Sequence, residues 1–167
     1  MRLHDLNALA DDEAARAFLR CCGSTRWAAR MSAARPFRDA EAIAGSSDAI
    51  WRALDETDWL EAFAAHPRIG ERTSGASGWS GEEQAGVAGA AEQTRRALDQ
   101  ANRDYEARFG YIFIVCATGK SADEMLALLG QRMRHDAWDE LRIAAEEQRK
   151  ITRLRLTRLL EGGPDTT

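Results

Sequence analysis

The feature that most constrains the fold is one apolar run, residues 109–117, which has the composition of a β-strand but no second strand to pair with. Its aromatic and β-branched side chains favour extended backbone. Buried backbone groups need hydrogen-bond partners, and elsewhere the apolar residues recur at helical spacings. We therefore predict an all-α fold: a single-domain multi-helix bundle over residues 1–167. An extended or partly helical segment should thread through its core, with some amides available to a ligand.

Apolar residues spaced three or four positions apart predict helices along most of the chain. The predicted ranges are 11–22, 25–34, 39–54 with a potential break at 45–47, 58–65, 80–108, 121–133 and 136–160. Ser121 and Glu124 form a capping box that opens one of these helices. The buried line of the last helix is predicted to hold Trp138, Leu141, Ala145, Gln148, Ile151, Arg155 and Leu159.

Composition and motifs exclude several classes of protein. The net charge of -4 gives no general attraction to nucleic acid, and no segment reaches transmembrane length. No apolar run follows the first basic residue, so we expect a cytoplasmic protein without a signal peptide. Cys21, Cys22 and Cys116 fit no metal or redox spacing and are expected to be reduced and structural. The three histidines lie far apart in the sequence, and we expect no metal site.

His66 is the first candidate for chemistry. Pro67 disfavours helical backbone at the residue before it, so His66 should lie where a helix stops. A glycine-rich stretch without periodicity follows, up to Trp79, and is expected to be a loop. An imidazole in this place suits proton transfer near neutral pH, while the structural alternative is a capping or core histidine.

Two further polar residues break the apolar pattern. Glu83 extends the apolar stripe of the 80–108 helix and should face the core, although with Ser80 it also forms a capping box. Arg155 interrupts the apolar line of the last helix and either binds an anion or extends its charge to solvent. Together with His66 these groups suit a small polar anion.

Four blocks make the chain resemble the family of OHCU decarboxylases, which act on 2-oxo-4-hydroxy-4-carboxy-5-ureidoimidazoline in urate degradation. The blocks, which follow one another in the family's order, are residues 66–70, 80–84, 109–114 and 151–156. The chain departs from the family where Ile112 replaces a common proline. It departs again where His135, Asp136 and Ala137 replace Asn-Asp-Pro, which is expected to be only a helix start.

The resemblance implies an all-helical homodimer that converts its small-molecule ureidoimidazoline substrate to S-allantoin with stereospecific protonation and without metal or organic cofactor. By matching position, His66 would be the catalytic histidine and Glu83 its acidic companion. The implied substrate-binding groups are Pro67, Ser80, Gln84, the backbone of Phe113, Ile114, Val115 and Cys116, and the side chain of Arg155.

Two other functions stay open. One is a non-enzymatic helical binding or regulatory module for a ureide or a purine breakdown product. The other is an enzyme of the same fold that acts on a related carboxylated heterocycle. The stereochemistry and rate of allantoin formation would separate these functions from the decarboxylase.

Overall fold

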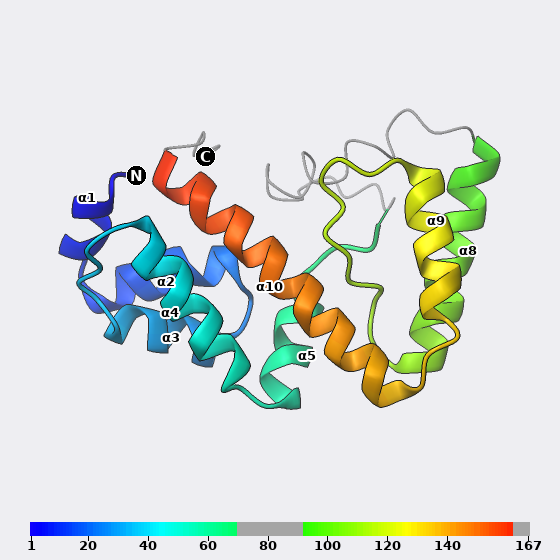
Figure 1. The fold of residues 1–167 in the computed structure, drawn as a ribbon, viewed down its shortest axis with the longest axis horizontal. Helices are drawn as coiled ribbons and strands as arrows, with labels where there is room; N and C mark the ends of the chain where they lie inside the picture. Colours follow the sequence, from blue (N-terminus) through cyan, green and yellow to red (C-terminus); the bar gives the residue numbers. More distant parts are fainter. Residues whose placement is uncertain (70–91, 162–167) are drawn as a thin grey trace. The chain divides into compact units, whose positions relative to one another are not determined.

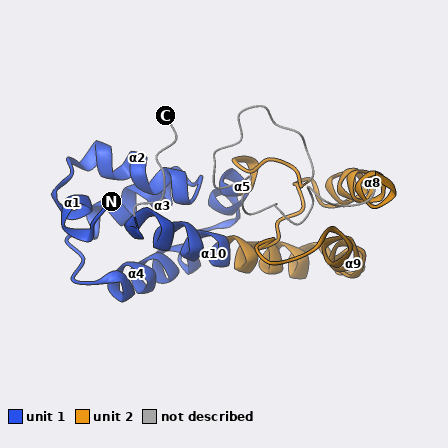
Figure 2. Ribbon diagram, turned by 90° about the horizontal axis from the view of Figure 1, so that it is seen from above, with its two compact units in different colours: residues 1–62, 149–167 blue, residues 63–148 orange. Residues whose placement is uncertain are grey.

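The computed structural model describes residues 1–69 and 92–161. Within these ranges the chain forms helices and no strand (Figure 1), which confirms the predicted all-α class. The helices are α1 (Leu3–Ala8), α2 (Asp11–Cys21), α3 (Thr25–Ala33), α4 (Ala40–Arg52), α5 (Glu56–Ala64), α8 (Glu92–Phe109), α9 (Ala122–Arg132) and α10 (Ala137–Glu161). The chain divides into two compact units, residues 1–62 with 149–167 and residues 63–148 (Figure 2).

Most helices lie close to their predicted bounds, and the differences have local causes. α4 runs through Gly45 without the potential break. The short helix α1 was not predicted, because Leu6 is its one buried residue and a single apolar position has no periodicity. The predicted inward position of Trp138 is wrong, since 58% of this residue is exposed. Glu83 and the rest of the predicted 80–91 turns lie outside the described residues.

Unit 1 is built around aromatic side chains between its helices. α3 packs against both α2 and α4. Trp27 and Phe18 are fully buried and meet edge to face, with ring centroids 6.0 Å apart. The indole N–H of Trp27 donates to the carbonyl oxygen of Ser47 at 3.4 Å, so the largest core side chain also satisfies its polar atom.

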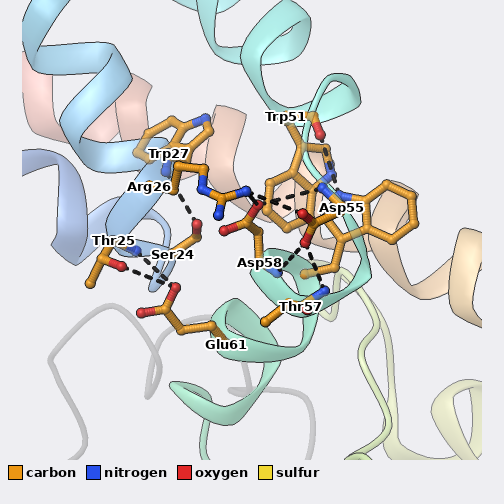
Figure 3. Close-up of polar contacts among 10 residues, drawn as sticks. Ser24, Thr25, Arg26, Trp27, Trp51, Asp55, Thr57, Asp58 and Glu61 are labelled. Atoms are coloured by element: carbon orange, nitrogen blue, oxygen red, sulfur yellow. Dashed lines mark hydrogen bonds and ion pairs between the residues drawn. The ribbon is translucent and has the colours of Figure 1, made fainter.

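A polar network in unit 1 ties α5 and the residue before it to the beginning of α3 (Figure 3). Arg26 donates to Asp55 at 3.1 Å and to Asp58 at 2.9 Å. Glu61 accepts hydrogen bonds from the backbone N–H of Thr25 at 3.1 Å and from its hydroxyl at 3.2 Å. The bond from the Thr25 N–H satisfies one of the amides that α3 leaves open at its first turn. The contacts of this network hold α5, the helix that leads into the candidate histidine.

In unit 2, α8 and α9 lie side by side and cover a non-helical segment (Figures 1 and 2). Gly110, with φ of 82°, ends α8 in the left-handed conformation that favours glycine. Residues 112–117 then form neither helix nor strand, and Phe113, Ile114 and Val115 are buried. The buried cluster of this unit comprises Ile69, Leu98, Tyr105, Phe113, Val115, Ala117, Ala122, Met125 and Leu129. The predicted threaded segment is confirmed.

Helix starts behave as the sequence predicts where capping residues are present. The Ser121 hydroxyl accepts the N–H of Glu124 at 3.2 Å, and the Glu124 carboxylate accepts the N–H of Ser121 at 2.7 Å. Asp136 accepts the N–H of Asp139 at 2.9 Å, which confirms residues 135–137 as a helix start.

The three cysteines are free thiols in different surroundings. Burial raises the pKa of Cys21 to about 12. It also raises the pKa of Cys22 to about 11. Cys116 is half-buried. A raised pKa lowers the fraction of reactive thiolate at neutral pH.

We expect iodoacetamide at about pH 8 to alkylate Cys116 rapidly in the folded protein while Cys21 and Cys22 stay unmodified, because the last two are protonated and enclosed. Mass spectrometry of timed samples measures the number of labels, and all three thiols should react in urea. The Cys116→Ser variant is the control and should take up no rapid label. Rapid labelling of Cys21 in the folded protein would contradict this prediction.

Candidate functional site

His66 lies where the proline rule places it, two residues beyond the last residue of α5. Its backbone N–H donates to the carbonyl oxygen of Phe63 at 3.1 Å. His66 and Pro67 are both half-buried. The imidazole therefore sits on a short connection whose beginning is fixed by the helix before it.

The residues directly after Pro67 are fixed to α8 by an anchor made of two contacts. Arg68 pairs with Glu106 through two hydrogen bonds, from Nε at 2.9 Å and from Nη2 at 3.0 Å. The side-chain amide of Asn102, one turn earlier on α8, donates to the carbonyl oxygen of Ile69 at 3.1 Å. We call these contacts the α8 anchor. It holds the chain on the far side of His66.

The beginning of the non-helical segment packs close to the same connection. The rings of Phe63 and Tyr111 lie 5.4 Å apart between centroids. Phe63 comes three residues before His66, and Tyr111 comes two residues before Phe113. Within unit 2 the structure thus brings together the helix end that leads to the candidate histidine and the segment predicted to bind substrate.

Charged side chains hold the backbone of this segment. Arg132 Nη1 donates to the carbonyl oxygen of Ile114 at 2.6 Å. Glu147 Oε2 accepts the N–H of Cys116 at 2.7 Å, and Lys120 Nζ donates to the carbonyl oxygen of Cys116 at 2.8 Å. The Cys116 amide therefore has a protein acceptor already, which narrows the set of amides open to a ligand.

Val115 lies between these two held residues, and no described residue holds its own backbone groups. Across residues 1–69 and 92–161, no hydrogen bond reaches its N–H or its carbonyl oxygen. The only cis peptide bond in this part of the chain is Arg35–Pro36, so the bonds around Val115 are trans. In a trans peptide group the N–H and C=O point in opposite directions. The N–H of Val115 thus points away from Arg132, and its carbonyl points away from Glu147.

A buried ion pair supports the arginine that holds Ile114. Arg132 is 6% exposed and Glu140 is fully buried. Arg132 Nε donates to Glu140 Oε1 at 2.7 Å, and the Tyr105 hydroxyl donates to the same oxygen. His135 Nδ1 lies 2.8 Å from Glu140 Oε2. The guanidinium also lies over the ring of Phe113, 4.8 Å from its centroid.

Electrostatics keep the Tyr105 hydroxyl a donor within this cluster. Burial raises the pKa of Tyr105 far above its usual range, Arg132 acts against this, and the bond to Glu140 raises it further. The hydroxyl therefore stays protonated at all physiological pH values, and Glu140 keeps two donors on one oxygen.

Arg155 belongs to unit 1 and lies in α10. It is 7% exposed, so the interpretation in which it extends its charge to solvent is wrong. Its positive charge also opposes the effect of burial on the pKa of Cys21. The remaining predicted site residues, Ser80, Glu83 and Gln84, lie outside the described ranges.

The predictions missed the residues that hold the segment from behind, although a signal was present for two of them. Arg132 lies three residues after Leu129 and seven after Met125, on the buried face of α9. Glu140 lies four residues before the buried Ala144. In both helices the buried apolar residues define the face on which the charged residue lies. Asn102 likewise lies on the buried face of α8, four residues after Leu98, whereas nothing in the sequence pattern marked Glu147.

Neither a metal-binding cluster nor a membrane-spanning helix is found in the part of the chain that the structure describes. There, no group of three or more His, Cys, Asp or Glu side chains is arranged to hold a metal ion. Likewise, none of the described helices is long and apolar enough to span a membrane.

Comparison with known proteins defines the class to which this helical architecture belongs. The model of the OHCU decarboxylase family matches residues 7–157. A crystal structure of OHCU decarboxylase in the presence of (S)-allantoin superposes with a TM-score of 0.79 at 36% sequence identity, covering 92% of this chain and 99% of that one. The chain belongs to the OHCU decarboxylase family.

Two sequence relatives place the chain more closely. It is 39% identical over 145 residues to the uric acid degradation bifunctional protein TTL of Arabidopsis thaliana, covering 83% of this chain and 45% of that longer protein. It is 27% identical over 161 residues to the 2-oxo-4-hydroxy-4-carboxy-5-ureidoimidazoline decarboxylase of Haloferax volcanii, covering 93% and 94% of the two chains. The chain thus spans less than half of the bifunctional relative and nearly all of the shorter one.

We expect the Arg68–Glu106 pair of the α8 anchor to contribute roughly 0.5 kcal/mol of coupling, because its side chains are 44% and 35% exposed and water screens the pair. Arg68→Glu should destabilise the protein, and adding Glu106→Arg should restore part of the loss. Urea unfolding of both single variants and the double variant gives the coupling energy. Strictly additive changes would contradict a specific pair.

Proposed function

We propose that this protein catalyses the decarboxylation of 2-oxo-4-hydroxy-4-carboxy-5-ureidoimidazoline (OHCU) to (S)-allantoin in urate degradation. The observation on which the proposal rests is the family match over residues 7–157. The proposal is also supported by the structural similarity to an OHCU decarboxylase crystallised in the presence of (S)-allantoin, 99% of whose chain is covered. The enzyme would be a carboxy-lyase that acts on a carbon–carbon bond.

The chemistry of the substrate makes a cofactor unnecessary. When carbon dioxide leaves, the electron pair stays on the ring carbon that carries the hydroxyl, and the adjacent carbon–nitrogen double bond takes it up. The ring nitrogen of that double bond takes up a proton, the hydroxyl gives up its proton and becomes a carbonyl, and the carbon that carries the ureido group gains a proton. Since the substrate provides its own electron sink, the protein has to orient it and direct the protons.

His66 is the proposed proton-transfer group. An imidazole can accept and return a proton near neutral pH. The end of α5 and the α8 anchor hold the chain on both sides of it, which supports a fixed direction for the ring. Glu83 would orient this histidine or hold the ureido group. Pro67, Ser80 and Gln84 would contact the substrate.

The backbone of Phe113–Cys116 is the proposed binding edge for the ring or the ureido group. Val115 is its centre, because its N–H and its carbonyl oxygen have no partner among the described residues, whereas the Ile114 carbonyl before it and the Cys116 N–H after it are both bonded. A donor next to an acceptor complements the N–H and C=O of a ureide. Arg155 would hold an anionic or carbonyl oxygen of the substrate, as a buried guanidinium does well.

A stereochemical assay tests the function. With freshly generated OHCU, the protein should accelerate the decay of the substrate and yield allantoin of one hand, followed by circular dichroism. Racemic allantoin at the spontaneous rate would sink the proposal and favour a non-enzymatic binding module. Activity on another carboxylated heterocycle, with none on OHCU, would favour an enzyme of related specificity. Dialysis against EDTA should leave the rate unchanged.

His66→Ala and His66→Asn should each lower kcat about a hundred-fold or more, in keeping with the loss of a general acid–base group. The melting temperature should change little, because His66 is only half-buried on a connection between elements. His4→Ala, which removes an exposed histidine near the start of the chain, is the matched control and should keep full activity. Full activity in both His66 variants would show that another residue moves the proton.

Three broader proposals accompany the function. The chain would act as one domain, because the family match includes residues of both units. It would form a homodimer, as the family resemblance implies, with no nucleic-acid or membrane partner. It would work in the cytoplasm. Light scattering after gel filtration measures the molar mass of the protein in solution. A monomer mass at micromolar concentration would contradict the dimer.

A further inference from the structure

We propose that Arg132 is a positioning residue for the reaction: it fixes and polarises the peptide group between Ile114 and Val115, so that the N–H of Val115 is directed towards the substrate. This inference rests on the proposed function for its substrate. It concerns a residue that lies behind the binding edge and does not itself touch the reacting atoms.

The geometry of one peptide group is the first argument. Arg132 Nη1 donates to the Ile114 carbonyl at 2.6 Å, a short, charge-assisted hydrogen bond. The same trans peptide group carries the N–H of Val115, which therefore points to the opposite side. A cation on the carbonyl oxygen draws electron density from the amide and makes its N–H a stronger donor. Arg132 thus affects the N–H of Val115 through the peptide group that this N–H shares with the Ile114 carbonyl.

The arrangement of Arg132 is the second argument, because it is held on several sides. Glu140, which is fully buried, accepts from Nε at 2.7 Å, and Phe113 lies against the guanidinium at 4.8 Å. Glu140 is in turn held by Tyr105 and His135. A planar guanidinium can bind a carboxylate with one edge and a carbonyl with another, whereas an ammonium group acts as a single point charge.

The neighbouring peptide group supports the same direction. Glu147 takes the N–H of Cys116 at 2.7 Å, so the carbonyl oxygen of Val115, in the same trans group, points away from Glu147. A cation on the Ile114 carbonyl and an anion on the Cys116 amide each match the polarity of the group they hold. The N–H of Val115 therefore points away from Arg132, and its carbonyl oxygen points away from Glu147.

Arg35 provides a matched control for a purely structural role. The side chains of Arg35 and Arg132 are each 7% exposed, and Arg35 donates to the carbonyl oxygens of Leu6 at 3.0 Å and Leu9 at 2.7 Å. Like Arg132 it is an arginine with an enclosed side chain that holds backbone carbonyls, but it serves the connections of α1, α2 and α3. Arg35→Lys should lower the melting temperature and leave the substrate affinity unchanged.

The test compares Arg132→Lys with Arg35→Lys and the wild type at a temperature at which all three are folded. Weakening a donor that binds substrate and transition state equally should raise KM for OHCU about ten-fold, with kcat within about a factor of two. A structural defect instead lowers the concentration of active enzyme, so apparent kcat falls at constant KM. An unchanged KM in Arg132→Lys, or an equal rise in Arg35→Lys, would overturn the proposal.

A second measurement needs no substrate and separates this proposal from the function itself. The amide ¹⁵N resonance of Val115 should shift in Arg132→Lys and not in Arg35→Lys, because only the former changes the bond to the Ile114 carbonyl. A wild type inactive on OHCU would defeat the proposed function, while the resonance would still report on Arg132. An unmoved Val115 resonance would defeat the positioning role even in an active enzyme.

Glu140→Gln covers the case in which Arg132→Lys loses its helical circular dichroism. This variant keeps the shape of the side chain and an oxygen for Tyr105, but it weakens the pairing with Arg132. KM should rise by less than in Arg132→Lys, and the Val115 resonance should move in the same direction. If neither changes in Glu140→Gln, Arg132 has no positioning role.

Discussion

The structure of unit 2 depends on how one buried stretch of backbone satisfies its hydrogen bonds. Residues 112–117 lie in a helical protein and form no strand, yet Phe113, Ile114 and Val115 are almost fully enclosed. Leaving a buried amide or carbonyl without a partner costs about 1–3 kcal/mol. Side chains from α9, α10 and the following turn supply partners at Ile114 and Cys116, in place of a neighbouring strand. The segment is therefore held at individual peptide groups, those of Ile114 and Cys116, and not along a continuous ladder of hydrogen bonds.

A buried charge pair is a demanding way to hold a carbonyl. Removing Arg132 and Glu140 from water carries a desolvation cost of several kcal/mol per ion, which their mutual attraction offsets only when the remaining polar atoms are also bonded. Here Glu140 has donors on both carboxylate oxygens, and Arg132 has a carboxylate, a carbonyl and an aromatic face around it. Apolar residues of similar volume would fill the same space. They would not determine which way the Ile114 carbonyl points.

The fold was largely predictable from the sequence, and the candidate site only in part. Periodicity located α2, α3, α9 and α10, and the unpaired apolar run correctly indicated a threaded segment. Pro67 located His66 beyond a helix end, and the stripe of α10 placed Arg155 inward. What could not be predicted depends on contacts between residues distant in the sequence, such as Glu147 with Cys116 or Asn102 with Ile69. A helical period identifies a buried face but not the backbone group that a polar side chain on that face will meet.

The enclosed position of Val115 has a consequence for solubility. An N–H and a C=O without partners form the same edge by which an exposed strand recruits another polypeptide and aggregates. Val115 is 7% exposed, and charged side chains hold its neighbours Ile114 and Cys116 from behind. A second chain must pair over several consecutive residues, and here the Ile114 carbonyl and both backbone groups of Cys116 are already bonded, so the run of open groups is interrupted. The proposed ureide substrate is small and planar and would need only one donor and one acceptor, so the short open edge would favour it over a second chain.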